Sequence, residues 1–208
     1  TFSPAPSPST NQGIWPAFTN VDALIAMKNA NFTVNVPQAN YKQVALSEFR
    51  GEIPSVSANK LVLNVSGGAK GGAPEMLEYF LASPVGKKLP KLDQNLTVAG
   101  PATLNLDLKI PLSGPSDPII DVNLDFPGNR VQWSKLPPFE NLKGKIRFTE
   151  TYPEFENITA NFMGGDIKIS SASQAPGNNN FNIQGNVAAK FLKDYFAQDV
   201  TLETQPML

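Results

Sequence analysis

The chain has 208 residues, of which 41% are hydrophobic, and its 19 prolines and 15 glycines suit a folded protein with many turns. It has no cysteine and no histidine, which excludes disulfides, thiol nucleophiles, His-dependent triads and the common zinc sites. Its net charge of −1, without a long basic run, gives no footprint for nucleic acid. We therefore expect no metal, no cofactor and no nucleic-acid partner.

The N-terminal stretch TFSPAPSPST is rich in proline and serine, so residues 1–12 are predicted to be a linker. The sequence has no initiator methionine, no signal peptide and no apolar run of roughly 18 residues. We interpret it as a fragment of a longer protein that carries its targeting or anchoring segments elsewhere.

A first hairpin is predicted in ALIAMKNANFTV, with its loop at Asn29-Ala30. Counting outward from that loop gives three expected cross-strand pairs, which are Met27 with Phe32, Ile25 with Val34, and Ala23 with Val36.

Further along the chain, apolar and polar residues alternate in KLVLNV, TLNLDLKIPL, IIDVNLDF, LKGKIRF and NFNIQGNV. A two-residue period with one apolar side is typical of an antiparallel sheet that is wetted on one face. We expect Asp121, Asn123 and Asp125 to lie on the wetted face. The motif DVNLD is therefore read as strand rather than as a calcium loop, which would need Gly at 126 and Glu at 132.

Two more hairpins are predicted from glycine-containing pairs. A loop at Gly128-Asn129 would place Phe126 opposite Val131 and Leu124 opposite Trp133. A loop at Gly164-Gly165 would place Phe162 opposite Ile167 and Ala160 opposite Ile169.

Two segments have helical spacing instead, and predict short amphipathic helices near residues 75–83 and 189–197. They resemble each other at an offset of 116, while upstream strand positions match at offsets of 98 and 99. We therefore expect two diverged repeats, residues 13–100 and 101–208, each ending in such a helix.

Signals for chemistry are weak. The segment SGGAKGGAPE lacks the GK[ST] of a phosphate-binding loop and is interpreted as a flexible connector. The acidic residues of TETYPEFE are expected to be solvated rather than catalytic. We expect the protein not to be an enzyme.

The apolar side of so many strands must be covered, and helices about 14 Å long are too short to cover it. One solution is a β-sandwich that binds sugar or protein through its loops, with Trp15 or Tyr152 as an exposed aromatic platform. The other is one strongly curved sheet around a groove that holds an apolar ligand.

From about residue 73 onward the chain resembles the AsmA-like superfamily of Gram-negative envelope proteins, and within it the YhdP group. The resemblance lies in the ordered succession of PEMLEYFLASPVGKKLPKL, LTVAGPATLNLDLKIPL, IIDVNLDFPGNRVQW, PPFENLKGKIRF, FENITANFMGGDIKISSAS and FNIQGNV. It implies a mainly β fold, a strongly curved antiparallel sheet that forms a hydrophobic groove or half-barrel.

The same resemblance implies a module of a periplasmic bridge, anchored to the inner membrane, that passes phospholipid toward the outer membrane. The implied partners are phospholipid or another acyl-chain lipid, flanking repeats of the same chain and an inner-membrane anchor outside this fragment. The candidate groove-lining residues are the apolar strand positions Leu104, Leu106, Leu108, Ile110, Ile120, Val122, Leu124, Phe126, Ile146, Phe148, Ile167, Ile169, Phe181 and Ile183.

Overall fold

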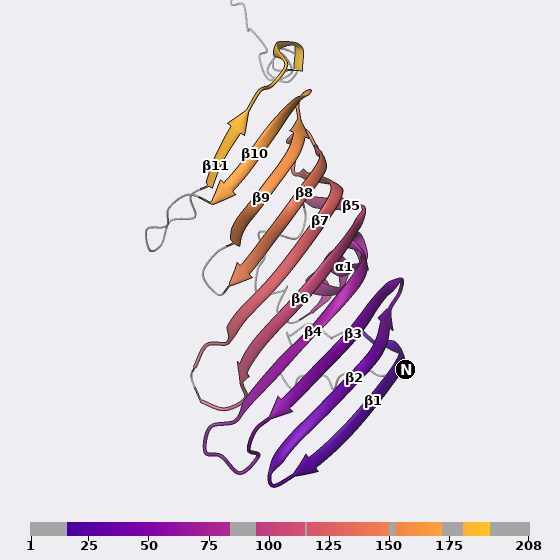
Figure 1. Ribbon diagram of the computed structural model, residues 1–208, viewed down its shortest axis with the longest axis vertical. Helices are drawn as coiled ribbons and strands as arrows, with labels where there is room; N and C mark the ends of the chain where they lie inside the picture. Colours follow the sequence, from indigo (N-terminus) through magenta and orange to yellow (C-terminus); the bar gives the residue numbers. More distant parts are fainter. Residues whose placement is uncertain (1–15, 84–94, 115, 150–152, 172–180, 192–208) are drawn as a thin grey trace, which may run out of the picture.

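The computed structural model describes residues 16–83, 95–114, 116–149, 153–171 and 181–191 (Figure 1). Within them the chain forms one 11-stranded antiparallel sheet and the helix α1, and residues 189–191 are helical as well. The elements are β1 (Thr19–Lys28), β2 (Asn31–Tyr41), β3 (Val44–Ile53), β4 (Val62–Gly72), α1 (Ala73–Ala82), β5 (Leu96–Ala99), β6 (Pro101–Pro111), β7 (Ile119–Trp133), β8 (Phe139–Thr149), β9 (Pro153–Phe162), β10 (Gly165–Ser171) and β11 (Phe181–Gly185).

Strands follow one another in the order β1-β2-β3-β4-β6-β7-β8-β9-β10-β11, and the short β5 pairs with β7 beyond the end of β6. The sheet is strongly twisted and stays open, with β1 and β11 at its edges (Figure 1). The predicted mainly β, curved and antiparallel fold is confirmed. The alternative of a two-sheet sandwich is wrong for the described residues, because their strands form a single sheet.

The strand register gathers apolar side chains on one side of the sheet, here called the apolar face. Directly opposed residues of antiparallel strands point to the same side. One row of such residues crosses seven neighbouring strands, namely Ala39, Leu46, Ala69, Leu104, Leu124, Ile146 and Phe155. A parallel row contains Leu106, Val122 and Phe148. The opposite side of the sheet is here called the polar face.

Four non-glycine residues inside strands have positive φ, which are Asn20 (50°), Glu48 (54°), Asn141 (53°) and Asn157 (52°). Each lies at or beside a shift in strand register. In all four segments an apolar residue stands two positions before the positive-φ residue and another stands one position after it, as in Phe155 and Ile158. A β-bulge adds one residue, so both apolar neighbours stay on the apolar face despite their odd separation.

The predicted hairpin at Asn29-Ala30 is confirmed, with Met27 opposite Phe32 and Ile25 opposite Val34. Both loop residues have positive φ, as a tight two-residue turn requires. Beyond Leu24 the register shifts, so the predicted pair of Ala23 with Val36 is not part of the ladder.

The predicted loop at Gly128-Asn129 is wrong, because β7 continues through it to Trp133. Gly128 has a positive φ but Asn129 does not, and such a turn needs both. The chain reverses after Trp133 instead, where the Leu136 amide donates to the Trp133 carbonyl. Pairs of Phe126 with Val131 and of Leu124 with Trp133 therefore do not form.

The third hairpin exists, but its loop lies one residue earlier, at Met163-Gly164, whose φ angles are 50° and 76°. Phe162 consequently pairs with Gly165, Ala160 with Ile167, and Ile158 with Ile169. The partner of Ala160 is therefore Ile167 instead of the predicted Ile169, two positions away. Because side chains alternate with a period of two, Ala160, Ile167 and Ile169 still share one face, as predicted.

The glycine-rich segment that follows Val65 is not a flexible connector. Residues 66–72 belong to β4 and pair along their length with β6, while 73–82 form α1. The predicted linker 1–12 and residues 192–197 of the second predicted helix lie outside the described residues. The division into two repeats remains a prediction.

Candidate functional site

Burial of the apolar face changes along each strand. On β6, Ala102 is 2% exposed and Leu104 to Ile110 are half-buried on that face, and Leu112, just past the end of the strand, is 48% exposed. The antiparallel neighbour β7 has the same profile in reverse order, with Ile120 and Val122 half-buried and Phe126 buried. One end of these strands is therefore packed and the other is open.

Neighbouring strands repeat this gradient. The packed strand ends, here called the closed rim, carry Ala39, Val44, Leu46, Ala69, Ala102, Phe126, Leu142 and Ile158, all buried. The opposite strand ends, here called the open rim, carry Phe32, Ile53, Leu63, Ile110, Ile120 and Phe148, all half-buried. Because the gradient recurs across the sheet, the apolar face is packed along one side and open along the other, and this curved face is here called the groove.

Helix α1 packs against the closed rim. Ala73 at its start is buried, and Met76 packs against both buried clusters of the apolar face. The ring of Tyr79 stacks on Phe18 with centroids 5.2 Å apart and meets Tyr41 edge-on at 4.9 Å. Figure 1 shows α1 behind the sheet, beside β5. The helix therefore covers the closed side of the groove.

A solvent-exposed ion pair adds to this attachment, because the Lys42 ammonium in the β2–β3 turn donates a hydrogen bond to the Glu78 carboxylate on α1. That hydrogen bond raises the pKa of Lys42 and lowers the pKa of Glu78. Burial raises the pKa of the neighbouring Tyr79 phenol well above its usual range. Tyr79 therefore stays neutral at ordinary pH and suits its packed position.

The polar face carries partly solvent-exposed charged groups that link neighbouring strands. Arg147 binds both oxygens of Asp121, at 3.0 and 2.9 Å, and reaches Glu154 at 3.3 Å. The Arg147 hydrogen bonds lower the pKa of Asp121. The predicted wetted position of Asp121 and Asn123 is confirmed by this network, in which Asn123 also donates to Asp121 at 2.9 Å.

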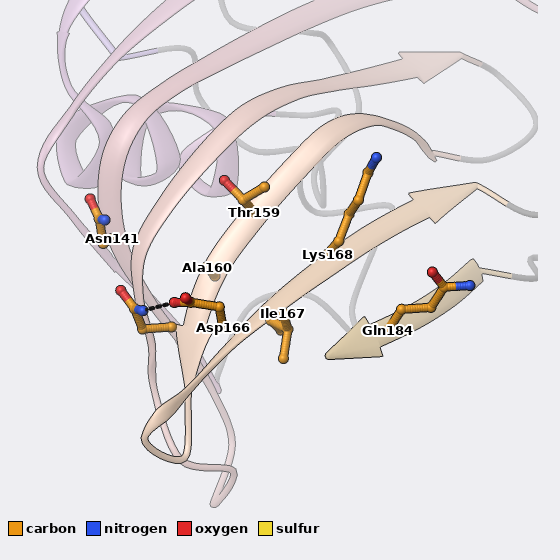
Figure 2. Close-up of a pocket in the computed structure, with 8 residues that line it drawn as sticks. Asn141, Thr159, Ala160, Asp166, Ile167, Lys168 and Gln184 are labelled. Atoms are coloured by element: carbon orange, nitrogen blue, oxygen red, sulfur yellow. Dashed lines mark hydrogen bonds between the residues drawn. The ribbon is translucent and has the colours of Figure 1, made fainter. Parts of the chain in front are cut away.

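A shallow depression of about 420 Å³ lies toward the C-terminal end of the sheet, and its lining includes Thr159, Asn161, Asp166, Lys168 and Gln184 (Figure 2). The Asn161 amide donates a hydrogen bond to the Asp166 carboxylate across the β9–β10 hairpin. These polar side chains belong to the polar face, and the buried residues Ala160 and Ile167 complete the lining.

The structure brings most of the predicted lining residues together. Nine occupy adjacent positions on β6, β7 and β8 and are half-buried, namely Leu104, Leu106, Leu108, Ile110, Ile120, Val122, Leu124, Ile146 and Phe148. Phe126, Ile167 and Ile169 lie in a packed cluster instead. Ile183 on β11 is 51% exposed and pairs with Ile169, while the side chain of Phe181 lies outside the described part.

Sequence patterns missed the contribution of β2 and β3 to the same face, where Val36 and Phe49 are opposed. The alternation in VALSEFRG is broken at Glu48, whose bulge hides the common orientation of Leu46 and Phe49. This bulge has a sequence signal, which is an Asn or Glu with an apolar residue two positions before it and another one position after it.

Within the described ranges, no three acidic side chains gather in a way that could hold a metal ion. In the same part of the chain, no helix is both long and apolar enough to span a membrane. Trp15 and Tyr152, the proposed aromatic platform, and Glu150 lie outside those ranges, whereas Glu154 binds Arg147 on the polar face.

Comparison with known proteins places this geometry in context. The family model described as YhdP protein matches residues 2–204. The intermembrane phospholipid transporter YhdP of Escherichia coli strain K12 is 25% identical over 163 residues, which cover 77% of this chain. The matched region is 12% of that protein's length, so the chain is similar to a small part of it. No solved structure matches the chain.

Proposed function

The chain belongs to the YhdP family, and on this premise we propose that its apolar face carries the acyl chains of phospholipids as they pass between two membranes. In this proposal the chain is one non-catalytic module of a longer bridge in the periplasm. The bridge is anchored to the inner membrane by a segment outside this sequence and delivers lipid toward the outer membrane.

The observation that supports the proposal best is the unbroken row of apolar residues from Ala39 to Phe155. Seven strands at a spacing of about 4.8 Å give this row a length of roughly 29 Å. Its middle part, at Leu104, Leu124 and Ile146, is only half-buried by the chain's own atoms. Apolar side chains that stay half-exposed side by side on neighbouring strands are typical of an interaction or ligand-binding surface.

Energetics favour acyl chains as the occupant. Each methylene taken out of water contributes about 0.8 kcal/mol. Exposing an acyl chain of about 16 carbons to water therefore costs on the order of 12 kcal/mol of free energy. A strip of leucine, isoleucine, valine and phenylalanine removes most of that cost. Because the strip lacks polar groups that would fix one position, a lipid can move along it.

The groove is expected to continue beyond this chain. Ile25 and Met27 on the edge strand β1 are 64% and 65% exposed. On β2, Val34 lies opposite Ile25 and Phe32 lies opposite Met27. An unpaired edge strand offers backbone hydrogen bonds to another strand. We propose that flanking repeats of the same polypeptide pair with β1 and β11 and extend the apolar face on both sides.

Lipid analysis tests this proposal. The full-length protein is purified from bacterial membranes in mild detergent, and its bound lipid is quantified by mass spectrometry. Near-stoichiometric phospholipid is the expected result, with a protein of similar size handled identically as the control. A protein that is stably folded and free of lipid would contradict the proposed function.

A further inference from the structure

The apolar face continues past the closed rim and ends at an exposed aromatic side chain. Strand β7 runs beyond the start of β6 and pairs there with β5, so that Val131 lies opposite Val98 and Trp133 lies opposite Leu96. Val131 and Val98 pack against the buried cluster that contains Phe126, whereas Trp133 is 54% exposed. Because side chains two positions apart point to the same side of a strand, Trp133 extends the apolar face into solvent.

The turn that follows Trp133 is apolar as well. Residues 133–138, with the sequence WSKLPP, are here called the β7–β8 tip, and they include no acidic residue. Leu136 in the tip is 39% exposed, and Lys135 beside it is also exposed. An indole ring next to an aliphatic side chain and a lysine is a combination suited to the interface between lipid headgroups and acyl chains.

Hydrogen bonds hold the tip in a fixed shape. The Leu136 amide donates to the Trp133 carbonyl at 3.1 Å, and the Ser134 amide donates to the Asn95 carbonyl at 2.5 Å. The side-chain amide of Gln132 donates to the Leu136 carbonyl at 3.4 Å. A turn that is already ordered can present its apolar side chains to a partner with little further loss of conformational entropy.

The charge of the tip is complementary to an anionic surface. At its base, the Arg130 guanidinium and the Glu140 carboxylate neutralise each other at 2.7 Å. Lys135 forms no ion pair with any residue in the described ranges. Lysines near a membrane surface are attracted by anionic headgroups. A folded protein partner suits the tip less well, because protein interfaces typically involve roughly 20–30 residues on each side.

We propose that the β7–β8 tip contacts the surface of a lipid bilayer. Trp133 and Leu136 then lie at the boundary between headgroups and acyl chains, and Lys135 lies among anionic headgroups. This inference rests on the proposed function, because it requires the protein to work beside a membrane. The contact lies outside the groove, so it can be tested separately from the lipid that the groove carries.

Site-specific photocrosslinking tests the contact in the full-length protein in intact bacteria. The photoreactive amino acid p-benzoylphenylalanine replaces Trp133, Leu136 or Ile119 in separate variants. Ile119 is the matched control, because it lies at the opposite end of β7 and is also 54% exposed. After irradiation, mass spectrometry determines whether the labelled peptide carries a phospholipid or a protein. The measurement is repeated in the presence of Leu106→Asp or Val122→Asp, which should empty the groove, and of Lys135→Glu.

We expect phospholipid adducts at positions 133 and 136 to be severalfold more frequent than at position 119. They should persist with Leu106→Asp or Val122→Asp and decrease severalfold with Lys135→Glu. Adducts no more frequent than at position 119, or adducts with a protein, would overturn the membrane contact. Phospholipid adducts that disappear with Leu106→Asp and Val122→Asp would also overturn it, because they would come from the groove. None of these results would contradict the proposed function, which is tested by the phospholipid that co-purifies with the wild-type protein.

Discussion

The ring of Phe49 on β3 occupies the space directly over Gly67 on β4. A Cβ atom built on Gly67 would lie 2.6 Å from that ring, closer than any real Cβ contact. Gly67 also lies opposite Leu106, so the ring covers the apolar face between β3 and β6. The glycine therefore continues the groove surface by admitting a neighbour's aromatic ring.

Replacing Gly67 by valine should displace Phe49 and lower the free energy of unfolding by about 1–3 kcal/mol, the usual cost of overpacking. Urea unfolding of the purified protein measures this change. The matched control is Gly51→Ala, because a Cβ on Gly51 would meet Leu63 at an ordinary 3.8 Å. Equal effects of both substitutions would show that the Phe49 ring does not require the glycine.

The Asn157 bulge should depend on its unusual backbone. With φ at 52°, Asn157 has a conformation that β-branched residues avoid. Asn157→Val should therefore destabilise the protein by about 1–3 kcal/mol, whereas Asn157→Gly should be nearly neutral. Thermal unfolding compares the two variants. If valine is tolerated as well as glycine, the bulge does not hold Ile158 on the apolar face in the way described.

Asn129 on β7 is fully buried against Gly100, the residue between β5 and β6, and neither atom of its side-chain amide has a hydrogen-bond partner. A buried polar group without a partner costs about 1–3 kcal/mol. Asn129→Val, the apolar substitution closest to asparagine in volume, should therefore raise the urea midpoint. A lower midpoint would indicate that a water molecule or another group satisfies the amide.

Acid should weaken the cross-links of the polar face. The Arg147 hydrogen bonds hold the pKa of Asp121 below its ordinary value of 3.8. The folded state therefore binds fewer protons than the unfolded state, so this contribution is complete above about pH 4 and is lost as pH falls through the lower, folded pKa.

The melting temperature of the wild-type protein should accordingly fall more between pH 5 and pH 2 than that of Asp121→Asn, which cannot titrate at this position. Differential scanning calorimetry measures both profiles. Parallel profiles would show that the Asp121–Arg147 pair contributes nothing to stability.

Much of the fold could be predicted because side-chain alternation directly reports strand orientation. The pattern of Leu104 to Ile110 gave the correct face, and Asn29-Ala30 gave the correct turn, since short polar residues tolerate positive φ. The pair Gly128-Asn129 misled because local turn propensity was overruled by pairing of β7 with β8 on one side and with β5 on the other.

The extent of the groove was harder to predict. Bulges at Glu48 and Asn157 interrupt the alternation, so apolar residues on either side look as if they faced opposite ways. The degree of burial could not be predicted from the alternation either. Phe126 and Leu124 occupy equivalent positions in the strand pattern, although only Phe126 is a buried member of the packed cluster. Which end of a strand is covered depends on α1 and β5, elements distant in sequence.

Leu106 and Val122 are opposed in the middle of the apolar face, which we propose contacts lipid rather than a packed core. Leu106→Asp or Val122→Asp should leave the fold substantially intact, since both residues are half-buried. Loss of two methylene contacts at about 0.8 kcal/mol each would reduce lipid binding by about tenfold or more. Asn105→Asp adds the same charge on the polar face and serves as the control.

The most direct measurement is the amount of phospholipid bound per mole of folded Leu106→Asp protein, compared with Asn105→Asp and the wild type. We expect a loss of bound lipid in Leu106→Asp alone, with an unchanged circular dichroism spectrum. Equal lipid in all three proteins, or outright unfolding of Leu106→Asp, would contradict it.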